Sequence, residues 1–402
     1  LALLERGALD ITLPGHPYPL GRPLRDNSPV VLNREFTGAN TFLAAGQLER
    51  GIPPDPAIDL GNGIVDIPAV ATTNTVDKDF RRGYIQSFNF TIQRRLPANF
   101  TAQASYVGTR SIRQTAFVNI NAATPGTGNA GRPLNILFGR TADTRVHRPL
   151  HVSNYNALQA RLDRRFSSGI LTTVAYTFSK TISWADNSDG GLFFNTPSAL
   201  ARNRALAGFD RPHNLEVFTV AELPFGAGKR WANSSRSARL LAGGWQVNAV
   251  LSSFSGTPFT VSSSGTSLNA PGNSQTADQI KSTVEKPGHI GRGQSFFDPL
   301  AFRSVTEPRF GTAGRNTLRG PGLVNLDFGL FRDFKLGERL TMQFRSEVFN
   351  LTNTPHFNNP GAGVSSMTLN PDGSIRALGG YTEVTGARGD ERQFRFALRF
   401  SF

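Results

Sequence analysis

The chain has 402 residues and no cysteine, which excludes a disulfide framework and a thiolate metal site. Abundant glycine (41), proline (25) and phenylalanine (31), with only 38% hydrophobic residues, disfavour a helical protein and favour many strands joined by turns and long loops. The net charge of +14 comes from basic residues that are scattered along the chain, so we expect anionic lipid or lipopolysaccharide, and no nucleic acid, as its partner.

Residues 1–80 are the least regular part of the sequence. Eight prolines between positions 14 and 56 interrupt them, so we expect an irregular extracellular loop with one short strand near Val30–Phe36. The opening stretch LALLERGALD lacks the basic and apolar regions of a signal peptide, and no run of 18 apolar residues occurs anywhere in the chain. The sequence therefore predicts neither a leader nor a transmembrane helix within these residues.

From residue 81 to residue 402, apolar residues recur at every second position, which indicates β-strands. In the stretch Tyr155–Phe166, for example, Leu158 and Leu162 alternate with polar residues. This periodicity predicts about 9–12 strands in residues 81–402. The clearest ones cover 84–95, 100–110, 155–166, 170–182, 213–223, 244–256, 324–334, 339–350 and 393–402.

Short and long connections alternate strictly between these strands. The shorter ones lie at 96–99, 167–169, 224–243 and 335–338, and the long ones at 111–154, 183–212, 257–322 and 351–391. Transmembrane barrels have short periplasmic turns and long extracellular loops, whereas soluble β-sandwiches seldom have several long loops. The sequence therefore predicts an all-β, antiparallel transmembrane β-barrel of the bacterial outer membrane, of which this chain forms the C-terminal part.

The last strand has the most regular alternation in the chain. Ten residues at about 3.3 Å each, tilted by about 40°, rise roughly 25 Å, which matches the apolar band of an outer-membrane barrel. A terminal strand of this kind is read by the barrel assembly machinery through strand addition, with the aromatic side chains in pockets. The residues predicted to carry this signal are Phe394, Phe396, Leu398, Phe400 and Phe402.

The opposite faces of several strands carry charged and amide side chains, as expected for the wall of a water-filled lumen. A slip of one residue in the last strand would turn Arg395 and Arg399 toward lipid, at about 2–4 kcal/mol each near the midplane, so the register is strongly determined. The candidate lumen-facing residues are Gln159, Arg161, Asp163, Arg165, Gln343, Arg345, Glu347, Arg395 and Arg399.

No motif in the chain predicts catalysis, a cofactor or a metal ion. His147 and His151 have the spacing of a helical metal pair, but they flank Pro149 in a predicted loop. The glycine-rich stretch at 288–295 lacks the Lys-Ser/Thr ending of a phosphate-binding loop. We therefore expect a protein that is not an enzyme, with no catalytic, cofactor-binding or metal-ligating residues.

Several stretches resemble the C-terminal barrel of TonB-dependent outer-membrane receptors, in particular the Oar-like branch. They are RGYIQSFNFTIQRRLPANFTAQASYVGTR (82–110), NYNALQARLDRRFSSGILTTVAYTFSKTI (154–182), FDRPHNLEVFTVAELPFG (209–226), NTLRGPGLVNLDFGLFRDF (316–334), EVFNLTNTPHFNNP (347–360) and the terminal FRFALRFSF. The order and spacing of these motifs, from Asp79 to Phe402, are more specific than any one of them.

This resemblance implies a receptor that imports a large or scarce solute. Its relatives have a larger barrel plugged by an N-terminal domain, and a TonB box that engages the energy-coupling complex. We expect those parts outside this chain, and the solute is not readable from it. Two alternatives remain open on the sequence: a passive porin-like or adhesive surface barrel, and a secreted soluble carbohydrate-binding β-protein.

Overall fold

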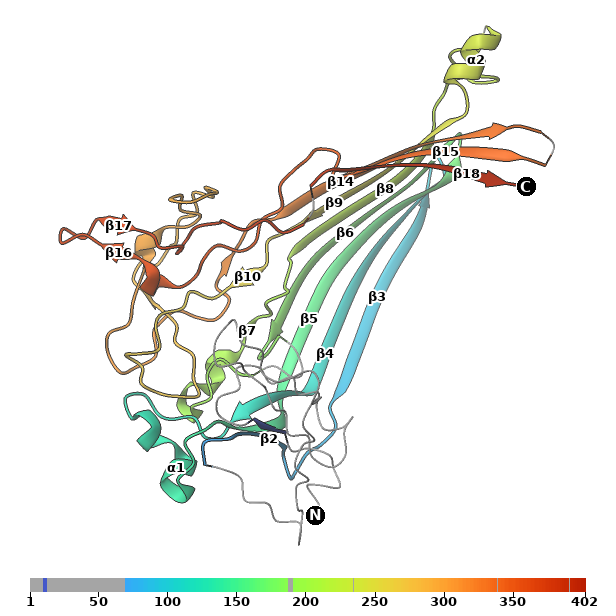
Figure 1. Cartoon of the computed structure of the whole chain (residues 1–402). Coiled ribbons are helices and arrows are strands. Elements are labelled where there is room, and N and C mark those ends of the chain that lie inside the picture. Colours follow the sequence, from blue (N-terminus) through green and yellow to red (C-terminus); the bar gives the residue numbers. More distant parts are fainter. Residues whose placement is uncertain (1–9, 13–68, 187–190, 234, 338, 390) are drawn as a thin grey trace, which may run out of the picture.

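The fold is dominated by one large curved sheet of long strands (Figure 1). The computed structural model describes residues 10–12, 69–186, 191–233, 235–337, 339–389 and 391–402. Twelve of the described strands share this sheet. Nine of them are long: β3 (Tyr84–Leu96), β4 (Phe100–Asn119), β5 (Thr144–Ser167), β6 (Ile170–Ser183), β8 (His213–Glu222), β9 (Trp245–Phe254), β14 (Leu323–Lys335), β15 (Thr341–Phe349) and β18 (Gln393–Ser401).

Each long strand pairs antiparallel with the next long strand in the chain, which confirms the predicted antiparallel arrangement. Three short strands extend the sheet: β1 (Asp10–Thr12), β2 (Thr72–Val76) and β7 (Ala205–Leu206). Strand β2 pairs with the start of β5 in parallel, which the sequence did not predict. The strand expected near Val30–Phe36 lies outside the described residues.

Two strands are longer than the sequence predicts. Strand β4 continues to Asn119 and β5 begins at Thr144, so the connection predicted at 111–154 shortens to 120–143. Pro149, which suggested a loop, lies in β5 where the β4–β5 register is irregular between Gln114 and Ala116. A bulge tolerates proline because no regular ladder hydrogen bond is lost there.

The tight turns have the backbone conformation that short hairpins need. Ala98 and Asn99 after β3, and Ser168 and Gly169 after β5, all have positive φ, between 52° and 78°. This left-handed backbone matches the twist of the paired strands. The β8–β9 connection carries a short helix, α2 (Arg236–Ala242), which lies with the C-terminus at the tight-turn end of the sheet (Figure 1).

The register makes one face of the sheet mostly apolar. Phe400 pairs with Met342, which pairs with Phe334, and Leu251 lies between Val217 and Leu326. The apolar side chains of β18 remain 53–67% exposed, since no described part of the chain covers this face. An exposed apolar surface of this extent fits contact with lipid.

The largest hydrophobic core lies in the long connections instead of under the sheet. It gathers Phe259, Phe297 and Phe302 from the β9–β14 connection with Tyr381 and others from the β15–β18 connection. The Phe297 ring lies 5.4 Å from the Tyr381 ring, centroid to centroid, nearly perpendicular to it. We call the described residues 191–212, 255–322 and 350–389 the loop cap.

Short elements give the loop cap its shape. The paired strands are β10 (Pro258–Phe259) with β13 (Leu318–Arg319), β11 (Asp278–Gln279) with β12 (Phe302–Arg303), and β16 (Thr368–Leu369) with β17 (Ile375–Ala377). A helix, α1 (Pro133–Phe138), lies in the β4–β5 connection. No helix in the described ranges combines the length and the apolar character needed to cross a membrane.

Candidate functional site

The polar face of the sheet brings together most of the residues that the sequence singled out. From β5, Arg161 is opposite Gln103 of β4 and Ala175 of β6, and the ladder continues across to Asn325 of β14. Residues directly opposite in a ladder share a face. The register therefore gives one common face to Gln159, Arg161, Asp163, Gln343, Arg345, Glu347, Arg395 and Arg399.

Arg165 is the exception among the nine candidates, because it falls in the bulge between Arg164 and Ser167. The structure thus gives it no regular place on either face. That the polar face lines a water-filled lumen remains a prediction.

Polar side chains on this face form local networks. Arg161 Nε lies 2.7 Å from an Asp163 carboxylate oxygen, and the Thr173 hydroxyl donates to the same carboxylate at 2.7 Å. At the other edge of the sheet, Arg345 Nε donates to the Gln343 amide oxygen at 2.6 Å, and Glu347 is directly opposite Arg395. These partly exposed contacts contribute little stability each, but together they make a hydrophilic wall.

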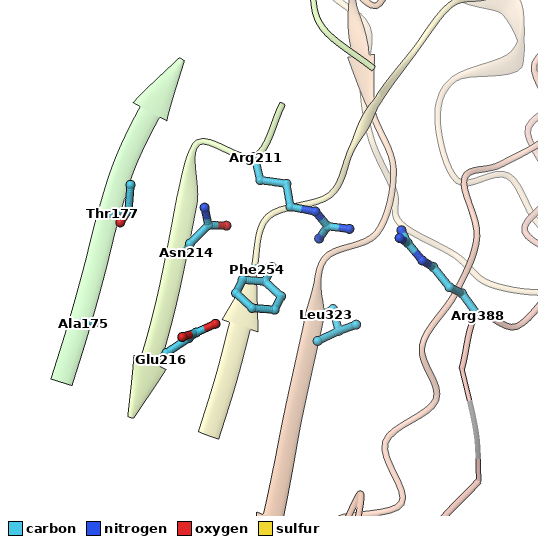
Figure 2. A pocket seen from close by; sticks show the side chains of 8 residues that line it. All are labelled: Ala175, Thr177, Arg211, Asn214, Glu216, Phe254, Leu323 and Arg388. Atoms are coloured by element: carbon cyan, nitrogen blue, oxygen red, sulfur yellow. The ribbon is translucent and has the colours of Figure 1, made fainter. Parts of the chain in front are cut away.

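A recess of about 530 Å³ opens where the polar face meets the long connections. Figure 2 shows its lining: two strands supply polar and small side chains, and two flanking segments supply arginines. The lining residues are Ala175 and Thr177 of β6, Asn214 and Glu216 of β8, Phe254 of β9, Leu323 of β14, and Arg211 and Arg388 from the connections.

The two arginines dominate the electrostatics of this recess. Their guanidinium groups point toward one another from opposite sides (Figure 2). Arg211 donates to the Ser255 carbonyl oxygen at 3.0 Å, and its guanidinium lies 5.7 Å from the centre of the Phe254 ring. Burial, and then the like charge of Arg388, lower the pKa of the Arg211 guanidinium. An anion between the two groups would relieve this repulsion.

A second recess of about 450 Å³ adjoins the first, because Phe254 and Leu323 line both. It extends along β14 and β18 and is lined by His356, Asp327 and Arg395 among others. His356 Nε2 lies 3.1 Å from the Val324 carbonyl oxygen. The hollow on the polar face therefore reaches from β6 to the last strand.

The sequence did not single out Arg211 or Arg388. Arg211 lies inside the FDRPHNLEVF stretch just before a predicted strand, and Arg388 lies in a long predicted loop. Their residue types gave no signal, because arginine is common throughout this chain. Only the folded loop cap brings them to the same recess.

The histidine pair that the sequence noted does not assemble a site. His147 stacks on Phe117 with ring centres 4.8 Å apart, and His151 stacks on Trp184 at 4.9 Å. Within the described ranges, no group of three or more histidine, cysteine or acidic side chains is placed to hold a metal ion. In the glycine-rich stretch 288–295, the Gly293 amide donates to a Glu383 carboxylate oxygen at 2.9 Å.

Solved outer-membrane structures share a distant likeness with the chain. The outer membrane transporter YddB from Escherichia coli has a TM-score of 0.43 and 9% identity, over 84% of this chain and 35% of its own. The ferripyoverdine receptor of Pseudomonas aeruginosa has a TM-score of 0.37 and 10% identity, over 81% and 29%. The ferric-catecholate import receptor Fiu from E. coli K12 has a TM-score of 0.35 and 10% identity, over 81% and 28%.

The chain thus covers about a third or less of the length of these structures. A search of curated proteins finds no match to it. A family model described as "Outer membrane beta barrel domain" matches residues 6–395, which is nearly the whole sequence. The match confirms the predicted fold and the predicted location in the outer membrane, and it removes the soluble alternative. The chain belongs to the family of outer membrane β-barrel domains.

Proposed function

We propose that this chain forms part of the wall of a TonB-dependent outer-membrane receptor that takes up a large or scarce solute. The observation that carries the proposal is the continuous hollow on the polar face, which begins directly under the loop cap. In such a receptor, the cap would capture the solute, and the polar face would offer it a hydrophilic path.

The internal bonding of the loop cap supports a capturing role. Arg202 donates to the carbonyl oxygens of Gly311 and Ala313 at 2.6 and 3.1 Å, and Arg315 donates to the Ser183 carbonyl oxygen at 2.8 Å. The Arg202 bonds join two connections far apart in the sequence, and the Arg315 bond ties the β9–β14 connection to the end of β6. A surface that is ordered before the solute arrives loses less conformational entropy on binding.

The partners follow from the surfaces. Outer-membrane lipid and lipopolysaccharide would contact the apolar face, and the barrel assembly machinery would bind β18, whose outer edge pairs with no described strand. An unpaired strand edge is costly in lipid, so β3 and β18 require further strands to close the wall. The TonB complex would act through parts outside this chain. The proposed role involves no catalysis.

The experiment separates an energy-coupled receptor from a passive barrel. The full-length protein in detergent would be titrated with the periplasmic domain of TonB, and the same preparation would be placed in planar lipid bilayers. The proposal predicts saturable TonB binding and no steady conductance, because a plug fills the lumen. Steady single-channel conductance without TonB binding would instead identify a porin-like barrel.

A further inference from the structure

The recess under the loop cap carries an unbalanced charge. Two guanidinium groups line it, from Arg211 and Arg388, against the single carboxylate of Glu216. Neither arginine forms an ion pair with any described residue. The only described polar contact of the Arg211 side chain is its bond to the Ser255 carbonyl oxygen, and Arg388 has no side-chain bond in the described part of the chain. A guanidinium has five donors, so most of them remain unused here.

Other arginines of the connections are bonded differently. Arg309 forms two parallel bonds to the Asp278 carboxylate, at 2.8 and 2.7 Å. Arg319 pairs with the fully buried Asp210, the residue next to Arg211. These arginines already have a carboxylate, as expected for a structural role. The two arginines of the recess lack one, although they face each other at a distance where like charges interact.

The floor of the recess is apolar. Phe254 and Leu323 lie below the guanidinium groups in Figure 2, at the ends of β9 and β14. A hollow of this size with a few polar groups above an apolar surface is typical of a small-molecule site. The lining therefore has two parts: a cationic clamp and an apolar floor.

We propose that the clamp formed by Arg211 and Arg388 binds an oxyanion of the imported solute, a carboxylate or a phosphate, while Phe254 and Leu323 contact its apolar body. This inference rests on the proposed uptake function, since it assigns a chemical class to the solute of the same hollow. Guanidinium groups bind both oxyanions through parallel hydrogen bonds, and Glu216 would repel the ligand.

The test uses the full-length protein in detergent and three small probes. These are naphthalene-2-carboxylate, 2-naphthyl phosphate and the neutral naphthalene-2-carboxamide, each titrated by calorimetry or by ligand-observed NMR. We expect both oxyanions to bind at least tenfold more tightly than the carboxamide. The ratio of their affinities then tells a carboxylate solute from a phosphate one. Equal binding of all three probes, or no saturable oxyanion binding up to about 10 mM, would overturn the proposal.

Four variants make the test specific. Arg211→Gln and Arg388→Gln should each weaken oxyanion binding at least tenfold, and Glu216→Gln should strengthen it. Arg376→Gln, on exposed β17, removes the same charge from the loop cap away from the recess and should change the affinity less than twofold. If Arg211→Gln does not assemble, Arg388→Gln alone still tests the clamp. This variant should fold, because the Arg388 side chain forms no hydrogen bond in the described part of the chain.

Two results among the variants would contradict the proposal. One is weaker oxyanion binding in Glu216→Gln, and the other is unchanged binding in Arg388→Gln. The binding assay needs no energy source, so its outcome is independent of TonB coupling. Oxyanion binding without TonB binding would refute the receptor proposal but not this inference. TonB binding without oxyanion binding would refute this inference but not the receptor proposal.

Discussion

A pair of adjacent substitutions in β9 best tests which face of the sheet contacts lipid and which contacts water. Leu251 is the seventh residue of β9, on the apolar face between Val217 and Leu326. Six steps of about 3.3 Å, tilted by about 40°, place it roughly 15 Å from Trp245, near the middle of an apolar band of about 25 Å. Its neighbour Val250 lies on the polar face, opposite Asp327.

Arginine at these two positions should have very different effects. Leu251→Arg should lower the free energy of unfolding by about 2–4 kcal/mol, because it places a cation at the middle of the bilayer. Val250→Arg should change it by less than about 1 kcal/mol, since the cation meets water and the Asp327 carboxylate. The two variants add the same side chain one residue apart. The difference between their free energies of unfolding therefore reports which face of β9 contacts lipid.

The assay is reversible denaturant unfolding of the full-length protein in lipid vesicles, followed by tryptophan fluorescence. The account predicts a difference of at least about 2 kcal/mol between the two variants, with Leu251→Arg the less stable. Equal losses, or a greater loss for Val250→Arg, would refute the assignment of the apolar face to lipid.

Three further predictions concern the terminal strand, the loop cap and pH. Phe402→Ser, or deletion of β18, should sharply reduce the amount of protein assembled in the outer membrane, as measured in a membrane fraction. Arg319→Ala should destabilise the loop cap by about 3–5 kcal/mol, because it leaves the fully buried Asp210 without its ion pair; limited proteolysis measures this. Burial lowers the pKa of His151 to about 4, and neither of its ring nitrogens has a partner in the described structure. The folded state therefore binds fewer protons than the unfolded state, and stability should fall by about 3 kcal/mol as the pH drops from about 6.5 to about 4.

Each of these predictions has a control. Gln393→Ser, at the other end of β18, should leave assembly unchanged, and equal loss in both variants would contradict a role for the terminal aromatic residue. Arg376→Ala should leave the proteolysis of the loop cap unchanged. His151 is opposite Gln114 in the irregular stretch of the β4–β5 ladder, within the segment 111–154 that the sequence predicts to be an extracellular connection. His151→Phe should remove the pH-dependent loss, and a loss that persists in this variant would assign it to other groups.

The strands were predictable because their signal is local. Period-two alternation in segments such as 324–334 and 393–402 depends only on which residues follow one another, and the structure has strands at both places. The turns could also be predicted, since Asn99 and Gly169 are residue types that adopt positive φ readily. The extension of β5 was missed because Pro149 suggested a loop, while a bulge accommodates it.

The loop cap could not be predicted in this way. Its core packs Phe259 and Phe297 against Tyr381, and no periodicity links residues so far apart in the chain. The recess depends on the same packing, because Arg211 and Arg388 come from different connections. Residue type alone did not distinguish them from the arginines that bind a carboxylate. Candidate lumen residues were easier to identify, since alternation within one strand defines their face.

The central claim is that these strands cross the outer membrane with one face toward lipid and the other toward water. The chain has no cysteine, so single cysteines can be placed at successive positions from 393 to 401 in β18 and spin-labelled. Accessibility to oxygen, which concentrates in lipid, and to a water-soluble nickel complex is then measured in the membrane. The account predicts that even positions favour oxygen and odd positions favour nickel, with a period of two. Uniform accessibility, or the opposite phase, would contradict it.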